Sequence, residues 1–113
     1  MLSRWSSHGT RVVQLPPLTS VRTMYVHTMT DLRHEFEQAA EDIQRLGQRP
    51  DNDTLLKLYA LYKQGSEGNV HGEQPGFFDF VGTAKYEAWA QLRGVSEGEA
   101  MQRYIELVRE LLA

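Results

Sequence analysis

Four segments of this chain carry apolar residues at helical spacing, and no segment alternates with the period of a β-strand. The clearest segment is the last, where Ser96 and Glu99 form a capping-box motif ahead of an apolar stripe that begins at Met101. The other three segments cover about residues 32–46, 51–64 and 80–92, and glycine or proline follows each of them. The pattern predicts an all-α protein, and a four-helix bundle satisfies it best.

The second segment has clear signals at both ends. Asp51 is expected to cap its N-terminus, where a carboxylate can accept a hydrogen bond from the backbone and complement the helix dipole. Gly65 and Gly68 are expected to end it. The glycine- and proline-containing stretch 66–79 then predicts a long loop before the third helix.

Composition excludes several classes of protein. The chain has 113 residues, enough for one domain, and no cysteine, so disulfides and thiolate chemistry are excluded. No apolar run approaches the roughly 20 residues of a membrane span, so no stable membrane insertion is expected. The net charge of −3 gives no basic footprint for nucleic acid.

Catalytic motifs are absent from the sequence. The four histidines are scattered without metal-ligand spacing, and no nucleophile elbow, P-loop or GxGxxG motif occurs. We therefore expect no catalytic residue, no metal, no cofactor and no enzymatic activity.

The first 30 residues differ from the rest of the chain, because they hold three arginines and no acidic residue. This shift predicts an N-terminal extension over 1–30 and a folded domain over 31–113. Three interpretations of the extension stay open: a mitochondrial transit peptide, a disordered tail without an address, or an incorrectly assigned start upstream of Met24 or Met29. The expected location is the cytoplasm, or the mitochondrion if the extension is a transit peptide.

The candidate binding residues lie on the second, third and fourth segments. Helical spacing places Tyr59 and Lys63 on one face, with Tyr62 beside them, and Lys85 begins a second cluster that includes Trp89. A ring and an ammonium together suit a phosphorylated nucleotide, since a base can stack and a phosphate can meet a charge. The competing interpretation is that the rings are core and the lysines are solvated.

Four ordered motifs give the chain a family resemblance. They are Tyr59-Ala-Leu-Tyr-Lys-Gln, Gln74-Pro-Gly-Phe-Phe-Asp-Phe, Lys85-Tyr-Glu-Ala-Trp-Ala-Gln-Leu-Arg-Gly and Glu99-Ala-Met-Gln-Arg-Tyr-Ile. Over about residues 32–112 the chain resembles the acyl-CoA-binding protein family. The resemblance implies an up-down-down-up bundle that carries and pools medium- to long-chain acyl-CoA esters as a monomer, without catalysis.

The resemblance also implies roles for individual residues. Those that match the family's nucleotide and phosphate site are Tyr59, Tyr62, Lys63, Lys85 and Tyr104. Those that match positions near the acyl groove are Phe36, Ala40 and Leu56.

The chain departs from the family at three positions that are often basic. Gln44, Val81 and Thr83 stand there, so fewer cations surround the expected phosphates, and Arg45 or Arg49 is the available substitute. Two alternatives to acyl-CoA carriage stay open: a helical protein-interaction module without a lipid ligand, and a thioesterase, for which no base is evident in the sequence.

Overall fold

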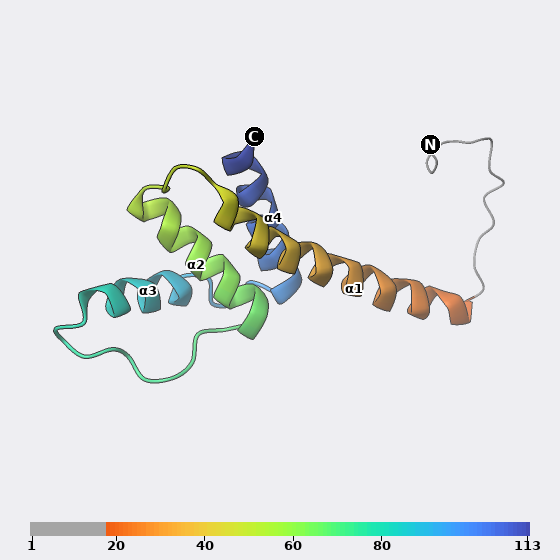
Figure 1. Ribbon diagram of the computed structural model, residues 1–113. Helices are drawn as coiled ribbons and strands as arrows, with labels where there is room; N and C mark the ends of the chain where they lie inside the picture. Colours follow the sequence, from red (N-terminus) through yellow and green to blue (C-terminus); the bar gives the residue numbers. More distant parts are fainter. Residues whose placement is uncertain (1–17) are drawn as a thin grey trace.

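The computed structural model describes residues 18–113, with side chains from residue 30 onward, and every regular element in this part of the chain is helical. Figure 1 labels the four α-helices. Their bounds, with a short 3-10 turn after the first, are α1 Leu18–Asp42, η2 Ile43–Arg45, α2 Asn52–Glu67, α3 Phe80–Ala90 and α4 Glu97–Leu112. The predicted all-α fold class is confirmed.

The helix directions follow from which residues meet. Gly65 of α2 lies against Met101 of α4, whereas Asp53 near the start of α2 shares a cavity with Glu110 near the end of α4, so these two helices are antiparallel. Helices α2 and α3 run in the same direction, as do α1 and α4 (Figure 1). The arrangement is the expected up-down-down-up bundle.

The core lies where α1, α2 and α4 meet. Its buried members are Phe36, Ala39, Leu58, Leu61, Met101, Tyr104, Ile105 and Val108. All of them except Tyr104 carry apolar side chains. Burial of such side chains stabilises the fold by about 25 cal/mol for each Å² of apolar surface removed from water. Helix α3 contributes little to this core and packs mainly on α2.

Helix α1 begins at Leu18, well before the expected start near residue 32. Its N-terminal half extends beyond the bundle (Figure 1), which explains why residues 18–30 show no amphipathic stripe. Residues 1–17 lie outside the part that the structure describes. The division into an extension over 1–30 and a domain over 31–113 stays a prediction.

Helix α2 does not end at Gly65 as expected but continues to Glu67. Gly65 is buried, and a Cβ atom there would lie only 3.1 Å from the Phe36 ring and 3.2 Å from Met101. The glycine therefore permits close helix packing. Gly68, with a φ of 78°, ends the helix as predicted.

Local hydrogen bonds fix the other helix ends. Asp51 caps α2 by accepting from Thr54 N at 2.8 Å, which lowers the pKa of its carboxyl, and Ser96 caps α4 by accepting from Glu99 N at 3.1 Å. Both caps were predicted. Fully buried Gln64 joins the segments between helices, because its Nε2 donates to Asn69 Oδ1 at 3.0 Å and to the Val95 carbonyl at 2.8 Å.

Candidate ligand-binding site

A lysine of α2 and a lysine of α3 each lie over an aromatic ring of the other helix. Lys63 of α2 has its Nζ 4.9 Å from the centroid of the Trp89 ring of α3, and Lys85 of α3 has its Nζ 5.3 Å from the Tyr59 ring of α2. On α2 Tyr59 and Lys63 are four residues apart, and on α3 Lys85 and Trp89 are four residues apart, so each helix presents one ring and one ammonium to the other. Tyr59 and the two lysines therefore lie together across α2 and α3, and Trp89 is buried at the contact with Lys63. This brings together three of the residues predicted from sequence.

Tyr62 and Tyr104 meet on the neighbouring side of α2, over Phe36. The Phe36 ring is stacked on Tyr62 at 5.3 Å and meets Tyr104 edge-on at 5.2 Å. Tyr104 is buried, which raises the pKa of its hydroxyl, with a further contribution from Tyr62. Tyr62 is more open, with 41% of its surface exposed, and is therefore accessible to a ligand.

An acidic side chain accompanies Lys63. Lys63 Nζ donates to Glu67 Oε2 one helical turn later, and His71 Nε2 lies 3.1 Å from the other carboxylate oxygen. The hydrogen bond from Lys63 is the main cause of a lowered pKa at Glu67. An incoming phosphate would have to compete with Glu67 for the Lys63 ammonium.

A groove of about 390 Å³ opens beside Tyr59 and Lys85, between the start of α2 and the first turns of α3. Its lining residues are Arg49, Asn52, Leu55, Leu56, Tyr59, Phe80, Val81, Ala84 and Lys85. The lining contains two cations and no carboxylate. An apolar groove with cations at its edge can hold a ligand that has both an apolar and an anionic part.

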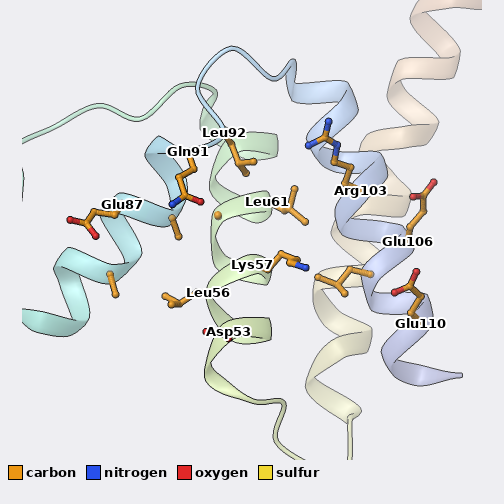
Figure 2. A pocket seen from close by; sticks show the side chains of 14 residues that line it. Asp53, Leu56, Lys57, Leu61, Glu87, Gln91, Leu92, Arg103, Glu106 and Glu110 are labelled. Atoms are coloured by element: carbon orange, nitrogen blue, oxygen red, sulfur yellow. The ribbon is translucent and has the colours of Figure 1, made fainter.

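A larger cavity, of about 630 Å³, lies on another side of α2, between α2, α3 and α4 (Figure 2). Its floor is apolar, with Leu56 and Leu61 among the side chains that line it. Four carboxylates surround it, from Asp53, Glu87, Glu106 and Glu110, against two cations, Lys57 and Arg103. The excess of negative charge disfavours an anionic ligand, so the smaller groove is the better candidate despite its size.

The structure separates the three residues that the resemblance placed near an acyl groove. Leu56 lines the smaller groove, whereas Phe36 is buried beneath Tyr62 and Ala40 packs against the core. Neither Phe36 nor Ala40 is among the groove-lining residues in the described part of the chain.

Val81, one of the residues that depart from the family pattern, lines the groove. Arg49, one of the two substitute cations named from the sequence, lines it as well. Arg49 also donates to Asn52 Oδ1 at 3.1 Å, which orients its guanidinium. Arg45 is instead paired with Asp42.

Sequence reasoning missed Asn52, Leu55, Phe80 and Ala84 as groove residues. The available signal was for Leu55, which belongs to the apolar stripe of the second predicted helix. Phe80 and Ala84 could be placed only once the packing of α3 on α2 was known.

The described residues offer binding groups rather than a reaction centre. No group of three or more histidine, aspartate or glutamate side chains among them could hold a metal ion. None of the described helices is both long and apolar enough to cross a membrane. The cations, rings and apolar groove described above suit recognition of an amphipathic anion.

These features define a helical binding protein, and comparison with known proteins identifies its family. Residues 33–108 match the family described as "Acyl CoA binding protein". A curated relative, "Acyl-CoA-binding protein homolog 1" of Caenorhabditis elegans, is 45% identical over 78 residues, which cover 69% of this chain and 91% of the relative. The chain therefore belongs to the acyl-CoA-binding protein family. This is a family of binding proteins, so the prediction of binding rather than catalysis is confirmed.

Solved structures agree with this assignment. Acyl-CoA-binding protein 2 of Oryza sativa superposes with a TM-score of 0.72 at 39% identity, covering 75% of this chain and 92% of that one. The yeast acyl coenzyme A binding protein gives a TM-score of 0.58 at 43% identity, covering 68% and 90%.

Proposed function

We propose that this protein binds medium- to long-chain acyl-CoA esters non-covalently, and carries and pools them without breaking or making a bond. One observation carries the proposal: Lys63 and Lys85 lie on one surface with Tyr59, next to an apolar groove whose lining has no carboxylate. An acyl-CoA has a matching division into an anionic nucleotide head and an apolar tail. Family membership supports the same ligand.

The head would be held by the cationic and aromatic residues. Lys63 and Lys85 are placed to meet the phosphates, and the Tyr59 and Tyr62 rings offer faces on which the adenine can stack. Tyr104 is buried beside Tyr62, with 4% of its surface exposed. A tyrosine hydroxyl is protonated at neutral pH, and burial raises the pKa of Tyr104 further, so the hydroxyl can donate a hydrogen bond to a phosphate or ribose oxygen.

The tail would lie in the smaller groove, against Leu55, Leu56 and Phe80. Each buried methylene contributes about 0.8 kcal/mol, or roughly a fourfold gain in affinity. Affinity should therefore rise with acyl-chain length until the groove is filled. Head contacts would supply the specificity for the CoA ester, and tail contacts the preference for chain length.

Calorimetric titration with palmitoyl-CoA, palmitate and CoA in parallel tests this proposal. We expect palmitoyl-CoA to bind more tightly than either of the other two, because only the ester engages both parts of the site. Equal affinity for palmitate and palmitoyl-CoA would refute anchoring of the head. Absence of binding by any of the three would favour a helical interaction module without a lipid ligand.

We further propose that the protein acts as a monomer in the cytoplasm, with the mitochondrion as the alternative. A single chain contributes all the proposed ligand contacts, which supports a monomer. Fluorescent fusions with and without residues 1–30 distinguish the two compartments, since a transit peptide would redirect only the longer one.

A further inference from the structure

Four large apolar side chains are unusually exposed in the loop before α3 and in its first turn. The exposed fractions of Phe77, Phe78, Phe80 and Val81 are 84%, 82%, 72% and 68%. The rings of Phe77 and Phe78 contact each other edge-on, with centroids 5.0 Å apart. Clustered exposed apolar surface of this kind marks a contact with another molecule or a membrane, whereas an isolated exposed residue needs no explanation. We call these four residues the aromatic tip.

The aromatic tip lies at the outer end of α3, away from α1 and α4 (Figure 1). None of its members belongs to the hydrophobic core, so none is needed to hold the bundle together. The carboxylate within the tip, that of Asp79, accepts a hydrogen bond from Gly82 N at 2.9 Å and caps α3. The Asp79 carboxylate is thus engaged in capping α3, whereas the apolar side chains around it take no part in the hydrophobic core.

The aromatic tip is continuous with the smaller groove. Phe80 and Val81 belong to both, and the same groove is lined by Arg49 and Lys85. Apolar side chains at the extremity, with cations behind them, match the depths of a lipid bilayer, where acyl chains lie beneath the phosphate groups. Aromatic residues are favoured at such interfaces.

We propose that the aromatic tip docks this protein reversibly and shallowly on the surface of a zwitterionic phospholipid bilayer, with the mouth of the groove facing the lipid. The inference rests on the proposed function, because the acyl chain of the ligand itself partitions into bilayers. Docking in this orientation would let the chain pass between bilayer and groove without crossing water. A neutral bilayer is favoured over an anionic one, since the whole chain carries a net charge of −3.

Flotation with phosphatidylcholine vesicles, in the absence of acyl-CoA, tests the docking directly. The variant Phe77→Ser with Phe78→Ser removes half of the tip without touching the groove lining. Leu112→Ser is the control, because Leu112 is also an exposed large apolar residue but lies at the end of α4. We expect the double variant to lose vesicle binding by roughly tenfold or more, and the control to bind as the wild type does. Raising the salt concentration should have little effect.

A second measurement gives a positive signal. Tryptophan emission of Phe78→Trp should shift to the blue on addition of phosphatidylcholine vesicles and be quenched by brominated lipid, whereas Leu112→Trp should show neither effect. Calorimetry without vesicles should give the same palmitoyl-CoA Kd for the double Phe variant and the wild type, within about twofold. That titration also isolates the proposed function, because loss of palmitoyl-CoA binding by the wild type would leave flotation unaffected.

Three results would overturn the docking proposal. Equal flotation of the double variant and the wild type would show that the tip does not contact lipid. A large rise in the palmitoyl-CoA Kd of the double variant in vesicle-free solution would make Phe77 and Phe78 part of the ligand site instead. Wild-type dimerisation in sedimentation velocity, abolished in the double variant, would assign the tip to a second copy of the chain.

Discussion

The Lys63 ammonium lies 4.9 Å from the centroid of the Trp89 ring, and so joins α2 to α3 at the centre of the proposed head site. Trp89 is itself fixed, because its Nε1 donates to the Gly68 carbonyl at 2.8 Å. Cation–π contacts of this kind contribute on the order of 0.5–2 kcal/mol. The lysine is therefore positioned before any ligand arrives, which lowers the entropy cost of binding a phosphate.

Replacing this lysine should weaken ligand binding. We expect Lys63→Ala to raise the Kd for palmitoyl-CoA by about 10- to 150-fold, the equivalent of 1.5–3 kcal/mol for a hydrogen bond to a charged group. Lys57→Ala is the matched control, since Lys57 lies on the same helix but lines the other cavity. Calorimetry of both variants measures the effect. An unchanged Kd in Lys63→Ala would remove this residue from the site.

Removing the acidic partner of Lys63 should have the opposite effect. Glu67→Gln eliminates a carboxylate that competes for the ammonium and repels phosphate, so we expect palmitoyl-CoA to bind about two- to fivefold more tightly. Glu106→Gln, on α4 at the larger cavity, should leave the Kd unchanged. Weaker binding in Glu67→Gln would indicate that Glu67 orients Lys63 for the ligand rather than competing with it.

The ionisation of Glu67 should report ligand binding. In the free protein its pKa is lowered, chiefly by the hydrogen bond from Lys63. The stability gained from this pair is present above the ordinary glutamate pKa and is lost as the pH falls through the lowered value. If phosphate takes Lys63 away, the Glu67 pKa should rise towards its ordinary value. Carboxyl NMR titrations with and without palmitoyl-CoA measure the change, and identical curves would contradict displacement.

Gln64 should be important for stability rather than for binding. Gln64→Ala leaves the Val95 carbonyl without this donor and removes one of the two donors to Asn69 Oδ1, the other being Gly94 N, so we expect the free energy of unfolding to fall by about 1–3 kcal/mol. Gln102→Ala, on the exposed face of α4, should change it by less than about 0.5 kcal/mol. Urea unfolding compares the two variants, and equal midpoints would show that the buried amide contributes no net stability.

Two glycines should respond oppositely to the same substitution. At Gly65, alanine gains about 1 kcal/mol in helix propensity but brings a Cβ within 3.1 Å of Phe36, and overpacking costs about 1–3 kcal/mol. Packing should win, because the neighbouring ring is itself confined between Tyr62 and Tyr104. At Gly47 no atom would lie within 4 Å, so Gly47→Ala should be neutral or slightly stabilising. Thermal unfolding of both variants tests this contrast.

Features set by local sequence were predictable, and those set by packing were not. The caps at Asp51 and Ser96 depend on residues three positions away, so the sequence alone identified them. Spacing placed Tyr59 with Lys63 and Lys85 with Trp89. Their crossed pairing depends on how α3 is aligned along α2, which no local pattern specifies. The buried role of Gly65 likewise depends on a ring from α1.

The shared direction of α2 and α3 sets a minimum length for the chain between them. The connecting residues, 68–79, must travel back along α2, whose 16 residues measure about 24 Å at 1.5 Å per residue. Twelve extended residues reach about 40 Å, and seven only about 23 Å. Losing five residues from this loop would therefore leave almost no slack for reaching the start of α3, which lies beside Leu55 and Leu56. Part of what resembles surplus surface chain is therefore a tether that the shared direction of the two helices requires.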